Sequence, residues 1–388
     1  MAEAIDFDAV AAARALEDVV RASADTNEAQ RHLSADVARA FARDGLYRVA
    51  APRDCGGSEQ APRIQIEVIE TIARVDGSAA WNLMIGIESF GLIAPGFSAC
   101  GDLIADPSAI LASSTAAVGR AERVDGGYRV SGQWPFVSGV HNASLFGATV
   151  QLWEDGEVRS DLGNRYALVP EGGFEILDTW HTSGLCGSGS HDVRLDDVFV
   201  PDARIVAPIG GSRHANPLLN FPLGARLAYN KVAVAWGLAR AAIDAFVDLA
   251  GGKTPRFTRR QLNERPRAQR AVAEAEVRFR AGKALVLDLL DEMWSAVQAS
   301  GHVTTRERAL FQLACSDAVL GCIEAVDKLC QAAGTSANQK GQPLERIMRD
   351  IRVVGQHITV APQHIEDAGR ILLGLPAQEM MLAGMPPE

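Results

Sequence analysis

The chain has 388 residues, of which 47% are hydrophobic and 22% are charged, a composition typical of a globular protein with two or three structural units. Its formal net charge of -10 argues against nucleic acid and anionic membranes as main partners, because phosphate binding needs clustered Lys and Arg. The N-terminus, Met1-Ala2-Glu3-Ala4-Ile5-Asp6, lacks an apolar signal core, and no apolar run looks long enough to span a bilayer. We therefore expect a cytoplasmic protein without a membrane partner.

The first part of the chain carries helical patterns. Helices are predicted over 8–22, over 27–44, from Pro62 onward and over 79–90. Asn27 is expected to cap the second of these helices, and Gly45 is expected to end it. Asp76-Gly77-Ser78 should interrupt the chain before the last helix, which is apolar on nearly every face and is expected to be buried.

From Ile110 the hydrophobic period changes to that of strands. Asp125-Gly126-Gly127 supplies residues that tolerate positive φ, so a tight hairpin is predicted between Val124 and Tyr128. Further strands are expected over 145–152, 165–169, 174–177 and 193–200. Short strands at this spacing are typical of a small barrel or sandwich.

From Leu218 to the end the sequence is Ala-rich and helical. Four long segments are predicted, over about 218–250, 266–299, 304–333 and 343–374. The short loops between them favour an antiparallel four-helix bundle. Pro362 should kink the last segment or shift its boundary. The predicted division is a helical domain over 1–109, a β domain over 110–212 and the bundle over 213–388.

The six cysteines are scattered, and no two of them form a Cys-x-x-Cys pair, which predicts reduced thiols that are mostly buried. Cys315 and Cys322 share a predicted helix face, but no His or carboxylate completes a ligand set at that spacing. His357 and His364 are also seven residues apart, with Pro362 between them. We expect no metal site.

The stretch from Gly132 to Gly139 combines aromatic residues with a hydroxyl at the end of a strand. Phe136 and Ser138 are two residues apart, and on a regular strand such residues face the same side. They could supply the flat apolar wall and the hydrogen bond that a flavin ring needs. The alternative is an ordinary core strand that ends in a Ser turn.

Several motifs, in this order and spacing, resemble the acyl-CoA dehydrogenase superfamily over nearly the whole chain. Within it, the closer resemblance is to the oxygenase components of two-component (group D) flavin-dependent monooxygenases. The motifs are Asp76-Gly77-Ser78-Ala79-Ala80-Trp81, the stretch 126–139, and the segments 184–193, 196–201 and 344–350. The resemblance implies an acyl-CoA dehydrogenase-like fold: an all-α N-terminal domain, a central β-barrel or sandwich, and a C-terminal antiparallel four-helix bundle.

The resemblance also implies where a flavin and a substrate would bind. Ser138 would lie near flavin N5. Trp81 would lie near flavin and substrate. Phe136 would lie against the ring, with Trp134 and Val137 as further contacts. Asn82 and Ser89 are candidates for the substrate pocket.

The segment that contains Arg349-Asp350 decides between two chemistries. Acyl-CoA dehydrogenases remove an α-proton with a Glu, which in most of them comes eight residues after the Asp of the matching pair; here that position is Ile358. A second family location for this base aligns near Ala228, again without a carboxylate nearby. A dehydrogenase without a base cannot deprotonate its thioester. Instead His357 stands where the monooxygenases carry a His, which can accept a phenol proton or hydrogen-bond the flavin hydroperoxide. A purely structural His357 is the alternative.

The end of the third bundle helix resembles the loop that holds the flavin phosphates. Gln331 and Gly334 match the family, whereas Thr335 replaces a second Gly, and Ser336 and Asn338 are candidate contacts. Thr254-Pro255-Arg256-Phe257 replaces the Arg-x-Gln-Phe-Gly motif of the dehydrogenases. These losses favour FMN over FAD, with Arg256 as either a phosphate partner or a solvated loop cation.

The function that the resemblance implies is a reduced-flavin-dependent monooxygenase. It would take reduced FMN, or alternatively FAD, from a separate NAD(P)H-dependent flavin reductase, since no NAD-binding βαβ unit is visible. Through a flavin C4a-hydroperoxide it would use O2 to hydroxylate an aromatic or heteroatom-bearing small molecule. A homotetramer is expected. The alternatives are an acyl-CoA dehydrogenase-like enzyme with an unrecognised base, an N-hydroxylating enzyme, and a flavin-binding protein without chemistry.

Overall fold

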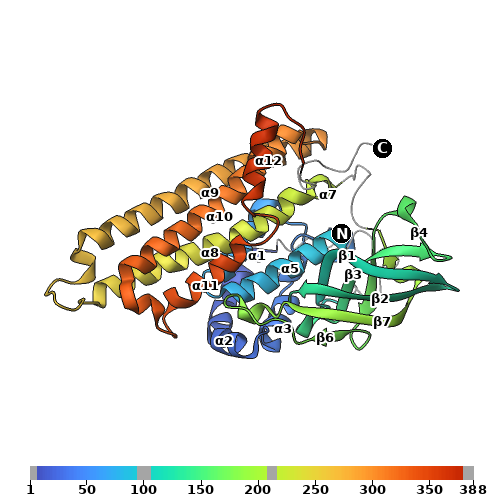
Figure 1. Ribbon diagram of the computed structural model, residues 1–388, viewed down its shortest axis with the longest axis horizontal. Coiled ribbons are helices and arrows are strands. Elements are labelled where there is room, and N and C mark those ends of the chain that lie inside the picture. Colours follow the sequence, from blue (N-terminus) through green and yellow to red (C-terminus); the bar gives the residue numbers. More distant parts are fainter. Residues whose placement is uncertain (1–6, 94–105, 208–215, 379–388) are drawn as a thin grey trace. The chain divides into compact units, whose positions relative to one another are not determined.

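The computed structural model describes residues 7–93, 106–207 and 216–378 (Figure 1). Its internal contacts group the chain into two compact units. The first comprises Met1–Gln65, Trp81–Thr182 and Cys186–Ser212, and the second comprises Ile66–Ala80, Ser183–Leu185 and Arg213–Glu388. The predicted division into three domains stays a prediction.

The first unit begins with three helices, α1 (Ala9–Ala15), α2 (Glu17–Gln30) and α3 (Ala35–Arg43). The predicted break between residues 22 and 27 is wrong, because Asn27 lies inside α2 and is fully buried. Its side-chain oxygen accepts hydrogen bonds from the backbone N–H of Ser34 at 2.8 Å and from its hydroxyl at 2.6 Å. Asn27 therefore stabilises the start of α3 from one helix away, and Gly45, at φ 70°, follows the end of α3 as predicted.

Two further helices follow, α4 (Pro62–Ala73) and α5 (Gly77–Ile93). Pro62 begins α4 as predicted. The Asp76 carboxylate accepts a hydrogen bond of 2.6 Å from the backbone N–H of Ala79, which fixes the first turn of α5. The apolar residues of α5, such as Leu83 and Phe90, are fully buried, as the all-round hydrophobicity of this helix predicts.

The β region is one mixed sheet. Its strands are β1 (Leu111–Val124), β2 (Gly127–Val137), β3 (Leu145–Glu154), β4 (Glu157–Val158), β5 (Arg165–Pro170), β6 (Glu175–Leu177), β7 (His191–Pro201) and β8 (Ile205–Val206). They are hydrogen bonded in the order β6-β7-β2-β1-β3-β5-β8, with β4 paired to β3, and Figure 1 shows β2 between β1 and β7. Along the described residues the hydrogen-bonded order runs from β6 to β8, and this β region comes between the two helical regions in chain order, as predicted.

The core of this sheet contains Trp134. Its indole is fully buried and meets the Phe146 ring edge-on, with 5.6 Å between the ring centroids. The indole N–H donates a hydrogen bond of 2.8 Å to the backbone carbonyl oxygen of Thr149. Trp134 thus packs inside the core of the sheet, and its contact with a flavin ring stays a prediction. Val137 is likewise fully buried in this core. Both residues position the end of β2 from inside the sheet.

The second unit contains the long helices. They are α7 (Pro217–Asn220), α8 (Leu223–Gly252), α9 (Pro266–Ser300), α10 (Thr305–Ala333), α11 (Pro343–Gly355) and α12 (Gln363–Leu372). Helix α10 packs against α8, α9, α11 and α12, as Figure 1 shows. The predicted fourth helix is two helices, and Pro362 stands at the N-cap of α12. The sequence predicted an interruption at Pro362. In the structure α11 already ends at Gly355, so the break between the two helices covers residues 356–362.

Helix α10 corrects one expectation from the sequence. Together with the turn that follows it, over Thr305–Asn338, it is long and apolar enough to pass as a membrane span. Most of its apolar residues are buried against the neighbouring helices of the bundle, which accounts for their hydrophobicity.

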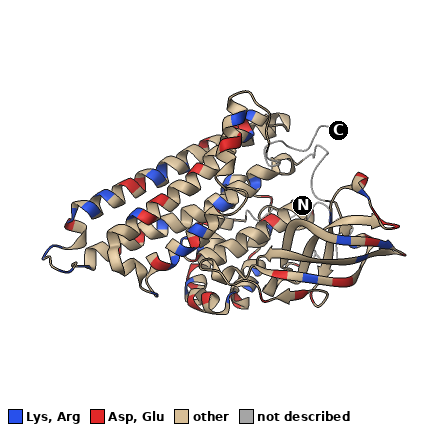
Figure 2. Cartoon of the chain, in the orientation of Figure 1, with Lys and Arg blue, Asp and Glu red and all other residues tan. Residues whose placement is uncertain are grey.

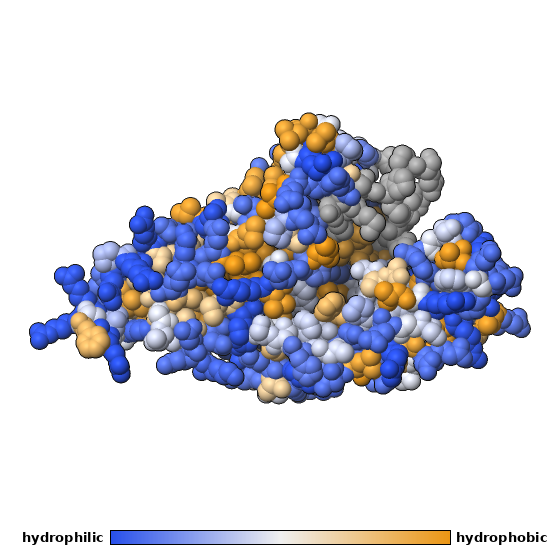
Figure 3. Space-filling model, in the orientation of Figure 1, coloured by the Kyte–Doolittle hydropathy of each residue, from blue (hydrophilic) through white to orange (hydrophobic). Residues whose placement is uncertain are grey.

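The exposed faces of the bundle helices carry both acidic and basic residues. Figure 2 shows basic and acidic residues alternating along α9 and α10. Glu274, for example, pairs with Arg270 on its own helix at 2.9 Å and with Lys328 on α10 at 2.6 Å. In Figure 3 apolar residues are also exposed between the hydrophilic ones, which is usual for protein surfaces. Because acidic and basic residues are mixed, α9 and α10 carry no basic stripe, in agreement with the acidic net charge.

Cys315, Cys322 and Cys330 are free thiols and are buried, as predicted. Burial raises the pKa of Cys330 to about 11, so this group stays a neutral thiol at neutral pH. Within the described ranges, no group of three or more His, Cys, Asp or Glu residues is arranged to hold a metal ion.

Candidate functional site

A chain of buried hydroxyls lies where β2 ends. The Ser138 hydroxyl is 2.7 Å from that of Ser190, which is 2.8 Å from that of Ser188. The indole N–H of Trp81 donates to the Ser138 oxygen at 3.1 Å. All four side chains are buried. The structure thus joins Trp81 and Ser138, two predicted site residues, and the Ser138 oxygen accepts a hydrogen bond from Trp81.

The backbone before Ser138 departs from a regular strand. The pairing of β2 with β7 shifts register between Trp134 and Val137, and Phe136 has a φ of 57°. Phe136 is 71% exposed, whereas Ser138 is only 4% exposed. The expectation that these two side chains share one face by simple alternation is therefore wrong. Left-handed φ is costly for a bulky residue, and such strain is concentrated at functional sites.

An aromatic corner forms around Phe136. Its ring meets Trp180, from the segment between β6 and β7, edge-on at 6.3 Å between centroids and 86° between planes. Sequence reasoning missed Trp180, although it stands shortly before the Gly184 to Val193 motif. An exposed Phe held in a strained conformation beside a Trp, at the end of an ordered hydroxyl chain, fits a flat ligand with a polar edge such as a flavin.

Asn82 and Ser89 both make internal hydrogen bonds. The Asn82 amide donates to the main-chain oxygens of Gly187 and Ser188, each at 3.3 Å. The Ser89 hydroxyl is 2.7 Å from that of Ser113. Asn82 thereby holds the Gly187–Ser188 turn beside the hydroxyl chain. Contact of Asn82 and Ser89 with a substrate stays a prediction.

His357 lies in the second unit, in the break between α11 and α12. Its Nδ1 accepts a hydrogen bond from the Thr359 backbone N–H at 3.3 Å and is 2.9 Å from the Thr359 hydroxyl. A backbone N–H can only donate, so in the neutral ring the proton resides on Nε2. Burial, together with the positive charge of Lys231, holds the pKa of His357 well below its usual value. The imidazole is therefore neutral at pH 7, with Nε2–H as a hydrogen-bond donor.

Side chains from neighbouring helices pin the loop that carries His357. The side-chain amide of Gln312 on α10 donates to the backbone carbonyl oxygen of Thr359 at 2.5 Å. Nε2 of His364 on α12 lies 2.5 Å from the backbone carbonyl oxygen of Ile358. Gln312 and His364 are buried. These contacts replace the helical hydrogen bonds that the break removes, so the backbone around His357 is held in place.

The Arg349-Asp350 pair holds a distant segment of the chain. Asp350 accepts a hydrogen bond of 2.6 Å from the backbone N–H of Leu185, and Arg349 donates to the Ser183 oxygen at 2.6 Å. Leu185 has a φ of 49° and is 1% exposed. The pair therefore has a structural role in fastening residues 183–185 to α11.

Removing the Asp350 carboxylate should destabilise the protein. Asp350→Ala leaves the buried Leu185 N–H without this acceptor, which should cost about 2 kcal/mol in free energy of unfolding. Asp350→Asn keeps one oxygen and should lose less. Chemical denaturation measures both, with Asp327→Ala, which removes a more exposed ion pair with Arg352, as the control. Equal stability of Asp350→Ala and the wild type would contradict this role.

The predicted phosphate loop follows α10. Lys253 donates from Nζ to the Ser336 hydroxyl at 2.7 Å and to the Ala333 oxygen at 2.6 Å. Arg267 donates to the Gln331 oxygen at 3.2 Å. Sequence reasoning missed both cations, and the predicted Arg256 is exposed. Gly334, at φ 65°, turns the chain here, and Asn338 is exposed. Contact of this loop with a phosphate stays a prediction.

Comparisons with known proteins cover nearly all of the chain. Residues 230–362 match the family described as acyl-CoA dehydrogenase, C-terminal domain. The chain is 31% identical over 346 residues to the indole-3-acetate monooxygenase of Pseudomonas putida, covering 89% of this chain and 88% of that protein. It is 29% identical over 364 residues to the FADH(2)-dependent resorcinol hydroxylase, oxygenase component, of Rhizobium sp. (strain MTP-10005), covering 88% of each. Among solved structures, the 3-HSA hydroxylase from Rhodococcus sp. RHA1 superposes with a TM-score of 0.85 at 26% identity, covering 96% of this chain and 99% of that one.

Proposed function

Since this chain belongs to the flavin-dependent monooxygenases of the acyl-CoA dehydrogenase superfamily, as an oxygenase component, we propose that it hydroxylates a small planar aromatic molecule. The observation that carries this proposal is His357. It stands next to Ile358, where a dehydrogenase would carry its Glu, and it presents a neutral imidazole whose Nε2–H can donate. A neutral donor suits oxygen transfer and cannot replace a carboxylate that removes an α-proton.

The roles of the residues in the first unit follow from their hydrogen bonds. Reduced flavin, when bound, supplies the activation of O2. Ser138, held by Trp81 and Ser190, would hydrogen-bond the N5 edge of the ring. Phe136 and Trp180 would form its apolar wall and exclude water.

The role of His357 follows from its tautomer. With Nδ1 engaged by Thr359, Nε2–H would donate a hydrogen bond to the substrate or to the oxygen that is being transferred. To accept a phenol proton at Nε2, the ring would first have to lose the proton that Nε2 carries. We therefore assign His357 the role of a hydrogen-bond donor.

For the cofactor we propose reduced FMN, with FAD as the alternative. The loop with Gln331, Gly334, Ser336 and Asn338 would contact the phosphate. Lys253, which donates to Ser336, and the predicted Arg256 would supply positive charge. The resorcinol hydroxylase is by name FADH(2)-dependent, so the choice of FMN for this chain rests on the missing diphosphate motif.

For the substrate and partners we propose the following. The two curated relatives act, by name, on indole-3-acetate and resorcinol, which are both aromatic. Asn82, Ser89 and His357 are the residues that we propose to lie near such a ring. A separate NAD(P)H-dependent flavin reductase would supply reduced flavin, and we propose a homotetramer in the cytoplasm.

Rapid mixing tests the proposal. The protein is mixed anaerobically with reduced FMN and then exposed to O2, while the return of oxidised-flavin absorbance is followed. The wild type should delay this return relative to free flavin. Ser138→Ala should shorten the delay about 10-fold, because one oriented hydrogen bond of about 1 kcal/mol or more is lost. Ser131→Ala, on the same strand but exposed, is the matched control. Reoxidation by the wild type at the rate seen in buffer would refute the proposal.

A further inference from the structure

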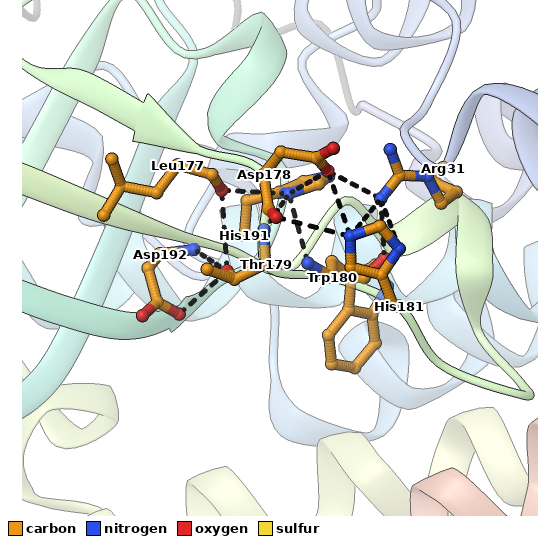
Figure 4. A network of polar contacts seen from close by, with 8 residues as sticks. All are labelled: Arg31, Leu177, Asp178, Thr179, Trp180, His181, His191 and Asp192. Carbon is orange, nitrogen blue, oxygen red and sulfur yellow. Dashed lines mark hydrogen bonds and ion pairs between the residues drawn. The ribbon is translucent and has the colours of Figure 1, made fainter.

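Beyond the residues that would touch the flavin, we propose that Arg31 and His191 are positioning residues that hold Trp180 against Phe136. This inference rests on the proposed function, in which the two aromatic rings form the wall of the flavin site. Figure 4 shows the network: Arg31 and His191 approach the segment 177–181 from two different elements.

Arg31 holds the carbonyl side of Trp180. One nitrogen of its guanidinium, Nη1, donates to the Trp180 oxygen at 3.2 Å and to the Asp178 carboxylate at 2.6 Å. Arg31 is the C-cap of α2 and has a φ of 60°, a position where Gly or Asn is usually found. An Arg in this left-handed conformation carries a backbone cost that a Gly would avoid, which favours a role for its side-chain contacts.

His191 holds the amide side of Trp180. It is the first residue of β7, is 3% exposed, and its Nδ1 lies 3.3 Å from the Trp180 N–H and 3.2 Å from the Thr179 N–H. Nδ1 is also 3.1 Å from the Leu177 oxygen, a contact that only a protonated Nδ1 could use. Burial lowers the pKa of His191, so its ring is neutral at pH 7. Two backbone N–H groups point at Nδ1, and the neutral tautomer with its proton on Nε2 leaves Nδ1 as their acceptor.

The N–H and the C=O of Trp180 are thus each held by a different element. The network contributes little to folding stability, because the Arg31–Asp178 ion pair is partly solvated, with side-chain exposures of 32% and 65%. Its geometric value is larger, since the segment between β6 and β7 carries the ring that meets Phe136 edge-on. We therefore expect these contacts to determine the position of the Trp180 ring and to have little effect on the stability of the fold.

Fluorine NMR on the full chain labelled with 5-fluorotryptophan tests the positioning directly. The chain has 6 Trp residues, and the signal of Trp180 is the one lost in Trp180→Phe. In Arg31→Met this signal should shift or broaden while the other indoles stay unchanged. Arg31→Lys should restore it in part, because the amine keeps the positive charge and the hydrogen-bond donors on a side chain that is one bond shorter. Arg39→Met, which removes an exposed ion pair on α3, is the matched control.

His191 is tested by a second pair of variants and by flavin binding. His191→Asn keeps an acceptor near the position of Nδ1 and should retain the Trp180 signal, whereas His191→Leu should lose it. Arg31→Met and His191→Leu should weaken the binding of reduced FMN at least fivefold, measured anaerobically by quenching of protein fluorescence. A Trp180 signal and an FMN affinity that are unchanged in both variants would overturn the inference. If the wild type does not bind FMN, the proposed function fails, and the NMR signal still decides whether Arg31 and His191 hold Trp180.

Discussion

Replacing His357 with Ala should lower the yield of hydroxylated product per O2 consumed by about 100-fold, a typical value for a positioned proton donor or acceptor. The physical reason is the loss of the Nε2–H donor, whose direction is set by the Thr359 contact to Nδ1. Oxygen consumption should continue, with hydrogen peroxide taking the place of product. The measurement is product and peroxide per reduced flavin in the same assay.

Two variants sharpen this result. His357→Gln retains an N–H donor on a side chain of similar length and should recover part of the product yield. His302→Ala, in the exposed connection between α9 and α10, should behave like the wild type. If His357→Ala forms product as efficiently as the wild type, His357 is a structural residue and the assigned role is wrong.

The lowered pKa of His357 gives the expected pH dependence. Because burial and the Lys231 charge keep the folded pKa well below the usual value, the imidazole should stay neutral as the pH falls below about 6.5. Product yield should therefore persist into this acidic range. In the unfolded chain the same His takes up a proton near pH 6.5, so this residue contributes stability that is lost as the pH falls. In His357→Gln the free energy of unfolding should depend less on pH in that window.

Gly237→Ala should destabilise the second unit by about 3 kcal/mol, the upper part of the range for overpacking a core. A Cβ at Gly237 on α8 would lie 2.3 Å from the Cβ of Ala73 and 2.7 Å from its carbonyl carbon. Both are rigid parts of α4, so the two helices would have to move apart. Thermal or chemical denaturation of the purified variant measures the change.

The matched control is Gly321→Ala on α10. A Cβ there meets no atom within 4 Å, so the change should stabilise the protein by about 0.5–1 kcal/mol through helix propensity and a less flexible unfolded chain. If the free energy of unfolding falls in Gly237→Ala and rises in Gly321→Ala, the effect of packing is separated from that of helix propensity. A stabilising Gly237→Ala would show that α4 and α8 do not approach as closely as described.

Local sequence signals predicted most of the elements. Pro62 begins α4, the Asp125-Gly126 turn joins β1 to β2, and the periodic apolar residues locate α8, α9 and α10 to within a few residues. These features depend on short-range geometry: the fixed φ of proline, the positive φ of glycine, and the 3.6-residue period. Asn27 shows the limit of such signals, because its partner Ser34 lies seven residues away in the next helix.

The candidate site could be predicted only in part. The motifs indicated Ser138, Phe136, Trp81 and His357, but they could not distinguish a ring that is exposed from one that fills the core, as Trp134 does. Burial of Trp134 is set by which face of β2 turns inward, and the register shift before Val137 reverses the alternation on which the sequence argument relied. A bulge of one residue has no clear signal in one sequence.

The sequence by itself determined the order of helical, β and helical regions, the family resemblance and the lack of a carboxylate at Ile358, because these depend on residue identity along the chain. Only the tertiary structure decided that Trp81 donates to Ser138, that Thr359 orients His357, and that Arg31 and His191 hold Trp180. Each of these contacts joins side chains or backbone groups whose distance is set by how strands and helices pack. Hydrogen bonds of about 3 Å depend on that packing to within a fraction of an ångström, which no pattern of residue types specifies.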